Sequence, residues 1–166
     1  IITGTRKGIG KNLAEYYTQN GFIVIGCSRD NVNFELNNYQ HYCLDVSDES
    51  LVKKMFKEIR KKCGRLDVLI NNAGVSSENH VLLTPLKEAH DSLNTNFIGT
   101  FIFCRESVKL MKMNQHGRII NISSIHVPLA LAGTSIYSSS KSAIEQFSRV
   151  LAHEVFHFGI TINILS

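Results

Sequence analysis

A glycine-rich turn joins the first apolar segment of this chain to its first helical pattern. The turn reads Thr3-Gly4-Thr5-Arg6-Lys7-Gly8-Ile9-Gly10 and follows Ile1-Ile2 directly. The apolar spacing after it predicts a helix, so the segment reads as strand, tight turn and helix. Glycines at such positions allow the turn, a close approach of the backbone to a pyrophosphate, and close packing of helix on strand. The free amides of the helix N-terminus would then bind the phosphates. An ordinary glycine-rich turn is the alternative for this segment alone.

Short apolar segments alternate with helical patterns along the rest of the chain. We predict strands at 21–29, 41–44, 67–70, 117–124 and 160–165, and helices at 47–63, 91–113 and 137–158. Ser47 and Thr84 are expected to cap helices, with Pro85 as a first helical residue. This alternation predicts an α/β fold, a doubly wound parallel sheet (Rossmann fold) in three layers with helices on both faces. The Asn-rich segment 31–40 predicts a loop where a helix would normally cover the sheet.

The composition and charge pattern exclude several classes of protein. The chain has 166 residues, of which 43% are hydrophobic and 19% charged, with a net charge of +4. This is enough for a single domain, residues 1–166. Basic residues are scattered, and their densest cluster, 53–62, is interleaved with Glu58 and apolar side chains, which indicates a solvated helix face. We therefore expect no nucleic-acid partner.

The sequence also indicates the compartment. No apolar run is long enough to span a bilayer and no signal peptide is present, so we expect a cytoplasmic protein with no membrane partner. Cys27, Cys43, Cys63 and Cys104 lack metal-ligand spacing, so we expect buried reduced thiols and no metal. The chain opens and stops inside predicted strands, which leads us to expect a fragment of a longer protein.

The end of the second predicted strand bears on cofactor choice. In dinucleotide-binding folds an acidic residue there binds the 2′-hydroxyl of NAD, whereas a basic residue suits the 2′-phosphate of NADP. Arg29 stands at this place, and Lys7 lies in the glycine-rich turn. Both residues favour NADP. Asp30 follows immediately and keeps NAD open.

Tyr137 and Lys141 are four residues apart in a predicted helix and so share a face. A nearby ammonium lowers the pKa of a phenol, which makes the phenol usable for acid–base chemistry at neutral pH. Two neighbouring surface side chains are the alternative. Asn96 borders the apolar run 97–101, where a polar side chain is costly without a partner, so it is a candidate for a functional or structural hydrogen bond. His80, in a loop, is expected to be solvated.

Together these motifs resemble the short-chain dehydrogenase/reductase family, in its single-domain branch, along essentially the whole chain. Thr3-Gly4-x-x-x-Gly8-Ile9-Gly10 resembles the cofactor loop, Asp45-Val46 the adenine contact, and Asn71-Asn72-Ala73-Gly74 the cofactor-lining motif. Asn96, Ser124, Tyr137 and Lys141 are similar in order and spacing to the family's catalytic tetrad. The 3-oxoacyl-carrier-protein reductase type is the most similar, judged from 159–163 and the helix 137–154. The sugar-nucleotide epimerase branch, with a longer chain and a shorter-spaced glycine loop, ranks well below.

The resemblance implies an NADP(H)-dependent oxidoreductase that interconverts a carbonyl and a secondary alcohol by hydride transfer. Tyr137 would be the acid or base, and Lys141 would lower its pKa and bind the nicotinamide ribose. Ser124 would polarise the substrate oxygen, and Asn96 would hold a water of a proton relay. Implied cofactor contacts are Gly4, Thr5, Arg6, Lys7, Gly8, Ile9, Gly10, Arg29, Asp45, Val46, Asn72, Ala73, Gly74, Tyr137 and Lys141.

The resemblance further implies the sheet order 3-2-1-4-5-6 and a homodimer or homotetramer formed through the helices at 91–113 and 137–158. The substrate would be a small carbonyl or alcohol compound, contacted by loops 75–84 and 125–136. The apolar segment 127–132 is either a substrate wall or core. A sugar, steroid or polyol substrate is an alternative. A non-catalytic, truncated cofactor-binding relative is another, because the family continues past Ser166 with a Pro-Gly turn, a substrate lid and a seventh strand.

Overall fold

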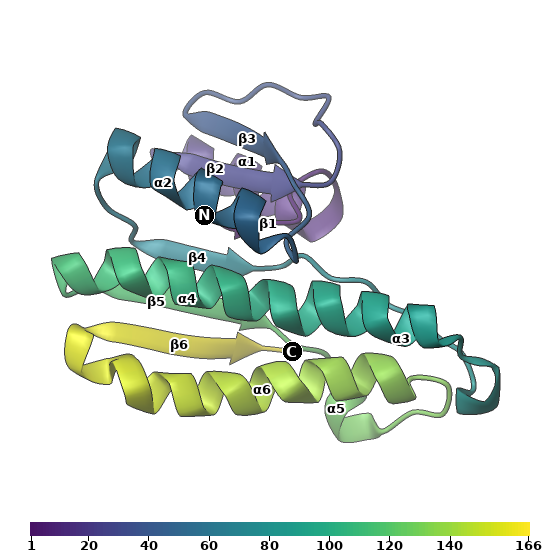
Figure 1. Ribbon diagram of the computed structural model, residues 1–166. Coiled ribbons are helices and arrows are strands. Elements are labelled where there is room, and N and C mark those ends of the chain that lie inside the picture. Colours follow the sequence, from purple (N-terminus) through teal and green to yellow (C-terminus); the bar gives the residue numbers. More distant parts are fainter.

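The computed structural model describes residues 1–166 and contains a six-stranded parallel sheet flanked by helices (Figure 1). The strands are β1 (Ile2–Thr3), β2 (Val24–Ser28), β3 (Tyr39–Cys43), β4 (Val68–Asn71), β5 (Gly117–Ile122) and β6 (Ile160–Leu165). Their order in the sheet is β3-β2-β1-β4-β5-β6, and every neighbouring pair is parallel. The predicted strand order is confirmed. In such a sheet the order of successive strands reverses between β1 and β4, and ligands bind outside the carboxyl ends of these strands.

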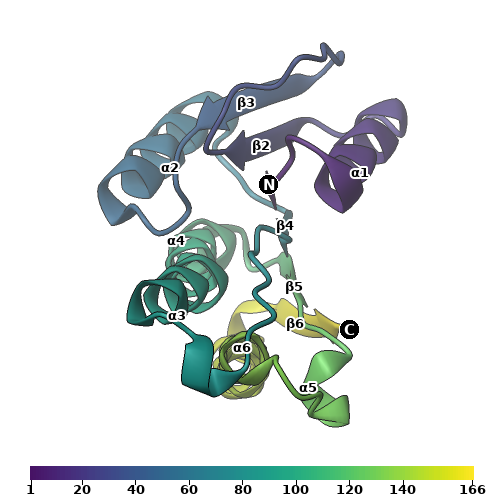
Figure 2. The same cartoon turned by 90° about the vertical axis from the view of Figure 1, so that its right-hand side faces the viewer.

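The longer helices cover the two faces of the sheet unequally. They are α1 (Gly8–Gln19), α2 (Glu49–Cys63), α3 (Leu86–Ser92), α4 (Gly99–Met111) and α6 (Ser135–Val155), joined by the short helices η1 (Val81–Leu83), η2 (Leu93–Ile98), η3 (Lys112–Asn114), α5 (His126–Leu129) and η4 (Phe156–Phe158). Figure 2 shows α2, α4 and α6 side by side on one face, and α1 on the other. Residues 29–38 form neither helix nor strand, so the loop predicted at 31–40 is confirmed except at Tyr39 and Gln40, which belong to β3. No helix combines the length and apolarity that a membrane crossing requires.

The helix predicted at 91–113 begins earlier and changes its winding. It starts at Leu86, continues as a π-helix over η2, and returns to α-helical geometry in α4. The wider turn surrounds Asn96, whose side chain hydrogen-bonds outside the helix. Such π-segments occur mostly as local insertions in α-helices, frequently at functional sites. Gly99 follows the segment, and a Cβ there would lie 2.6 Å from Val46 Cγ2.

The main core lies between the sheet and the α2–α4–α6 layer. Val52, Met55, Phe56 and Ile59 of α2 are buried, as the apolar spacing predicted. Phe56 packs edge-to-face against Phe103 of α4 at 5.7 Å between ring centroids. Full burial of each such side chain stabilises the fold by roughly 1.5–3 kcal/mol.

Several finer predictions are wrong. The apolar spacing predicts Leu51 of α2 and Val150 of α6 on the inner faces of their helices, but these side chains are 42% and 47% exposed. Adjacent residues of a helix point about 100° apart, so Leu51 turns away when Val52 points inward. Cys43 and Cys63 are exposed, whereas Cys27 and Cys104 are buried as expected, and all four are free. Burial raises the pKa of Cys27 and of Cys104 to about 12.

Two helix caps also differ from the prediction. Asp48, not Ser47, caps α2, because its Oδ1 accepts a hydrogen bond from the Leu51 amide at 3.0 Å. Ser47 instead donates its hydroxyl to Asp45 Oδ1 at 2.6 Å. Pro85 is the N-cap of α3 rather than its first residue, and Thr84 donates back to the His80 carbonyl at 3.1 Å.

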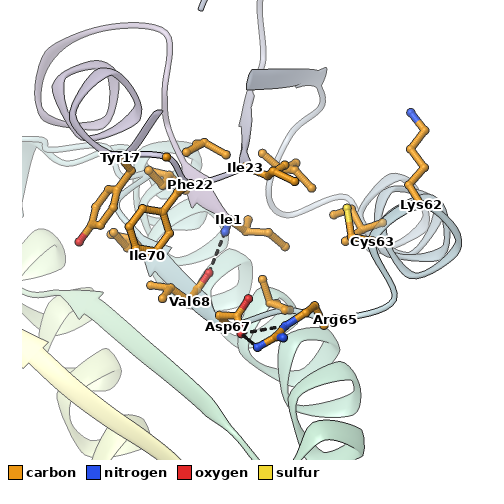
Figure 3. Close-up of a pocket in the computed structure, with 16 residues that line it drawn as sticks. Ile1, Tyr17, Phe22, Ile23, Lys62, Cys63, Arg65, Asp67, Val68 and Ile70 are labelled. Carbon is orange, nitrogen blue, oxygen red and sulfur yellow. Dashed lines mark hydrogen bonds and ion pairs between the residues drawn. The ribbon is translucent and has the colours of Figure 1, made fainter. Parts of the chain in front are cut away.

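An apolar pocket of about 540 Å³ lies at the amino ends of β1, β2 and β4 (Figure 3). Phe22, Ile23 and Ile70 are among the side chains that line it. The backbone nitrogen of Ile1 lies 2.7 Å from the Val68 carbonyl oxygen, which holds β1 against β4 at this end. Ligands of open α/β sheets bind at the carboxyl ends of the strands, opposite this pocket, so we place the candidate functional site there.

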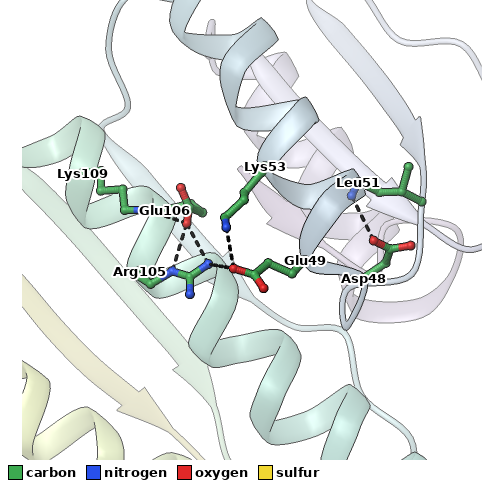
Figure 4. A network of polar contacts seen from close by, with 7 residues as sticks. All are labelled: Asp48, Glu49, Leu51, Lys53, Arg105, Glu106 and Lys109. Atoms are coloured by element: carbon green, nitrogen blue, oxygen red, sulfur yellow. Dashed lines mark hydrogen bonds and ion pairs between the residues drawn. The ribbon is translucent and has the colours of Figure 1, made fainter.

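An ion-pair network ties α2 to α4 on the outer surface (Figure 4). Glu49 lies 2.7 Å from Lys53 Nζ and 2.8 Å from Arg105 Nη2. Arg105 also forms an ion pair with the buried Glu106. The Oε1 atom of Glu106 lies 2.7 Å from Lys109 Nζ. Hydrogen bonds from Lys53 and then Arg105 lower the pKa of Glu49 to about 2.

We predict that this network loses stability in acid in a defined way. The folded-state pKa of Glu49 lies below its ordinary value of 4.5, so its contribution is fully present above pH 4.5 and disappears as the pH falls toward 2. Glu49→Gln should therefore lower the urea midpoint at pH 7, and its difference from wild type should shrink between pH 4.5 and 2. Glu154→Gln, at an exposed glutamate of α6, is the control and should show little difference at any pH. A difference for Glu49→Gln that does not vary with pH would contradict this account.

Candidate active site

A cleft of about 310 Å³ opens at the carboxyl ends of β1, β2, β3 and β4. It brings together most of the residues that the sequence indicated for a dinucleotide. Its lining includes Gly4, Arg6, Lys7, Gly8, Ser28, Arg29, Asp30, Asp45, Val46, Asn72, Ala73, Gly74, Val75 and Thr95. Thr5, Ile9 and Gly10 do not line it: Thr5 is fully buried, and the Ile9 side chain is 64% exposed to solvent.

The glycine-rich turn has the geometry that a phosphate requires. Gly4 and Gly8 have φ angles of 73° and 59°, a region that favours glycine. A Cβ on Gly10 would lie 2.2 Å from the Gly4 carbonyl oxygen, so the helix can pack this closely on the turn only without a side chain. The N-cap of α1, Lys7, provides no side-chain hydrogen bond. The first amides of α1 are therefore free to bind an anion.

Charge is distributed unevenly around the cleft. Asp30, the residue that kept NAD open, lies 3.3 Å from Arg6 in an ion pair. Lys7 and Arg29 are exposed and line the same cleft. Arg6 thus partly neutralises the acidic group, and Lys7 and Arg29 remain available to an anionic ligand.

Tyr137 and Lys141 lie at the start of α6, beside this cleft. Lys141 is 5% exposed, and its Nζ donates to the Ile122 carbonyl at 2.8 Å. The ammonium lies 5.9 Å from the centroid of the Tyr137 ring. Burial lowers the pKa of Lys141 to about 8. A Cβ on Gly74 would lie 3.5 Å from Lys141 Nζ and 3.2 Å from Asn96 Oδ1, so this cleft residue borders both side chains.

Asn96 is fully buried, and both the oxygen and the nitrogen of its side-chain amide have hydrogen-bond partners. Its Oδ1 accepts from the Val75 amide at 2.8 Å, and its Nδ2 donates to the Val75 carbonyl and to Ser140 Oγ, each at 2.9 Å. Ser140 in turn donates to the Tyr137 carbonyl at 2.7 Å. Asn96 therefore links the loop after β4 to the helix that carries Tyr137.

Ser124 follows β5 and faces a residue that sequence reasoning missed. Ser124 Oγ accepts from the His126 amide at 3.2 Å, and the His126 ring packs edge-to-face on Tyr137 at 5.7 Å. His126 Nδ1 is buried without a hydrogen-bond partner. The sequence could have indicated His126, because it is the one histidine between Ser124 and Tyr137.

The loops beside Tyr137 are apolar and open to solvent. Leu129 and Leu131 are 56% and 46% exposed, so segment 127–132 is not core. The segment 125–136 also contains the short helix α5 rather than loop alone. His80, expected to be solvated, is exposed, and its ring accepts from the Leu82 amide at 3.4 Å.

Comparison with known proteins identifies related chains. The family model described as short chain dehydrogenase matches residues 1–166. The chain is 35% identical over 162 residues to 3-ketodihydrosphingosine reductase of Bacteroides thetaiotaomicron, covering 98% of this chain and 60% of that protein. It is 30% identical over 172 residues to 3-oxoacyl-[acyl-carrier-protein] reductase FabG of Escherichia coli, covering 100% of this chain and 70% of that protein. The chain thus spans about 60–70% of the length of these relatives.

Solved structures share the fold closely. A short-chain dehydrogenase from Streptomyces avermitilis superposes with a TM-score of 0.92 at 32% identity, covering 98% of this chain and 62% of that one. ElxO with NADP bound gives a TM-score of 0.92 at 35% identity, covering 98% of this chain and 70% of that one.

The buried Lys141 ammonium should reduce stability. Its folded-state pKa is lower than in the unfolded chain, so the folded state gains stability as the pH rises from 8 to 10.5 and the penalty is relieved. We therefore expect Lys141→Met to raise the free energy of unfolding at pH 7 by about 1–3 kcal/mol, and this gain should shrink between pH 8 and 10.5. Urea unfolding across pH measures it. Lys112→Met, at an exposed lysine, is the control. A destabilised Lys141→Met protein at pH 7 would refute the expectation.

Proposed function

The chain belongs to the short-chain dehydrogenase family, and on this premise we propose that it is an NADP(H)-dependent oxidoreductase that interconverts a carbonyl and a secondary alcohol. The observation that carries the proposal is the arrangement around Gly74. Gly74 lines the cleft of the glycine-rich turn and also borders Asn96 and Lys141. A dinucleotide in the cleft would therefore extend toward Tyr137.

The cleft fits such a cofactor in shape and charge. Unblocked amides at the start of α1 and the open space at Gly8 would take the pyrophosphate. Asp45 and Val46 line the cleft, where the adenine would lie. Lys7 and Arg29 would bind the 2′-phosphate, and the ion pair with Arg6 would weaken competition from Asp30. When bound, the nicotinamide supplies or accepts the hydride. ElxO, a structural neighbour at 35% identity, has been solved with NADP.

The acid–base chemistry would fall to Tyr137. Its phenol would give a proton to the carbonyl oxygen during reduction or take one from the alcohol during oxidation. The Lys141 ammonium would stabilise the phenolate and bind the nicotinamide ribose. Ser124 would hold the substrate oxygen. Asn96 makes its hydrogen bonds to Val75 and Ser140, so we assign it the placement of the Tyr137 helix as well as a water of the proton relay.

The two segments predicted to contact the substrate, 75–84 and 125–136, indicate its polarity. Leu129 and Leu131 in the second segment, and Val81, Leu82 and Leu83 in the first, expose large apolar side chains. These surfaces favour a keto compound with an apolar chain, as in 3-oxoacyl-carrier-protein reduction. Reduction of 3-ketodihydrosphingosine is the second candidate, because the chain is 35% identical to the 3-ketodihydrosphingosine reductase of Bacteroides thetaiotaomicron. Partly exposed apolar residues of η2 and α6, Leu93, Ile98 and Val150, support assembly into a homodimer or homotetramer.

Tyr137→Phe tests the acid–base assignment. Loss of the phenol should lower kcat roughly 10²–10⁴-fold, the usual contribution of a general acid or base. The NADPH dissociation constant should change less than about twofold, because the ring is kept. Absorbance of NADPH measures turnover and its fluorescence measures binding. Tyr16→Phe, at an exposed tyrosine of α1, is the control. Undiminished turnover in Tyr137→Phe would remove Tyr137 from the mechanism.

Cofactor choice is tested with a charge-matched pair of variants. The double variant Lys7→Ala, Arg29→Ala should weaken NADPH binding roughly 10- to 100-fold, or about 1.4–2.7 kcal/mol in total, because water screens both exposed charges and each contributes less than the 1.5–3 kcal/mol of a typical charged hydrogen bond. NADH binding should stay nearly unchanged because NADH lacks the 2′-phosphate. The double variant Lys57→Ala, Arg60→Ala removes the same charge from exposed positions of α2 and should leave both affinities intact. Equal losses for NADH and NADPH would reject the 2′-phosphate assignment.

A further inference from the structure

His41 of β3 lies in the middle of a chain of polar side chains that runs from the glycine-rich turn to the end of β2. Its Nδ1 is 2.8 Å from the Tyr39 hydroxyl, which is 2.8 Å from Thr5 Oγ1. Its Nε2 is 3.0 Å from Ser28 Oγ and 3.2 Å from the Asp30 carbonyl. Ser28 and Asp30 line the cleft beside Arg29. The chain therefore ends in the wall where we place the 2′-phosphate.

The direction of these hydrogen bonds follows from what each group can do. The Ser28 hydroxyl donates to the Asp30 carbonyl at 2.7 Å, and a carbonyl only accepts. His41 Nε2 must therefore carry a hydrogen. In the neutral imidazole Nδ1 then accepts from Tyr39. In the protonated imidazole Nδ1 donates to Tyr39, whose hydroxyl turns to Thr5. Both charge states keep the hydrogen bonds of the ring, and the change between them needs only hydroxyl rotation.

The backbone leaves room for this arrangement. Gly26 pairs with His41 across β2 and β3. A Cβ on Gly26 would lie 2.2 Å from the Tyr39 hydroxyl oxygen and 2.4 Å from Thr5 Oγ1. Thr5, a residue of the turn that does not line the cleft, is thus part of the polar chain instead.

The charged groups around His41 and its burial determine whether its imidazole is protonated. Asp30, paired with Arg6, and Arg29 lie toward the cleft, and Glu35 lines the hollow on the other side with Tyr39 and His41. Lys11 stacks on Phe34, which packs against Tyr39. Burial lowers the pKa of His41, which favours the neutral imidazole in the free protein. A phosphate in the cleft would favour the charged form.

We propose that His41 is a positioning residue for the 2′-phosphate of NADP(H) and takes up a proton from solvent when this cofactor binds. The inference rests on the proposed function. His41 acts through Ser28 and Asp30 rather than by direct contact. It adds a positive charge behind the cleft wall only when a 2′-phosphate is present. NADH, which lacks this group, draws no proton.

The test compares His41→Gln with wild type. Glutamine keeps a side-chain donor for Ser28 and Asp30 but cannot be protonated. We expect the NADPH affinity of wild type, relative to His41→Gln, to increase roughly two- to fourfold as the pH falls from 8 to 6.5, because a cofactor that takes up a proton on binding binds more tightly as the proton concentration rises. NADH affinities should not diverge. Titration of the 2′-phosphate itself is common to both proteins and cancels. Tyr39→Phe removes the acceptor of the protonated ring and should reduce the pH dependence.

The outcomes separate the two proposals. Parallel NADPH curves for wild type and His41→Gln overturn the role of His41 while leaving the proposed function intact. Absence of NADPH binding in wild type at every pH overturns the proposed function and this inference with it. If His41→Gln does not fold, as judged by circular dichroism, the imidazole is titrated by NMR in wild type instead. A higher pKa with NADP⁺ than with NAD⁺ supports the proposal, and equal values refute it.

Discussion

The two halves of the sheet are held together by Thr3 and Asn72. Thr3 Oγ1 accepts from the backbone amides of Asn72 and Ala73 at 3.0 and 2.9 Å, and Asn72 Nδ2 donates to the Thr3 carbonyl at 2.9 Å. Both residues lie where β1 and β4 end, at the point where the strand order reverses. The glycine-rich turn packs on the same amide: a Cβ on Gly10 would lie 2.6 Å from Asn72 Nδ2. The glycine-rich turn can therefore lie this close to the end of β4 only because Gly10 leaves room for the Asn72 side chain.

From this contact the loop 72–75, followed by a chain of hydrogen bonds, leads to the reactive end of the cleft. Val75 follows Asn72 in the same loop and forms both backbone hydrogen bonds to Asn96. Asn96 continues to Ser140, and Ser140 to the Tyr137 carbonyl. Residues far apart in sequence are thus placed by buried partners rather than by flexible loops. Since a buried polar group that loses its partner costs about 1–3 kcal/mol, the chain resists displacement of any one member.

Sequence patterns could predict the parts of the fold that local chemistry determines. Apolar runs were sufficient for the alternation of strands and helices, and glycine positions for the turn at Gly4 and Gly8, whereas the strand order was implied by the family resemblance. Asn96 could be noticed because a polar side chain beside an apolar run needs a partner, but not that the partner is Ser140, because no local pattern encodes a contact 44 residues away. The choice between Ser47 and Asp48 as a cap depends on a one-residue difference in backbone, which periodicity does not resolve. His41 carried no signal, since its role comes from the register that places it opposite Gly26.

The cleft and the reactive end use charge in opposite ways. Around Arg29 and Lys7 the charges are exposed, so water screens them and they discriminate between ligands at little cost to the fold. Lys141 is buried, with the Ile122 carbonyl as its hydrogen-bond partner, and burial penalises its charge. A protein retains such a group when the charge has a use that the folded state alone does not supply. His41 lies between these cases: it is half-buried and already hydrogen-bonded, so that it can gain a charge without losing a contact. Because His41 lies behind Ser28 and Asp30, its protonation would make the cleft wall more positive when the 2′-phosphate binds. The residues of the wall would not have to move.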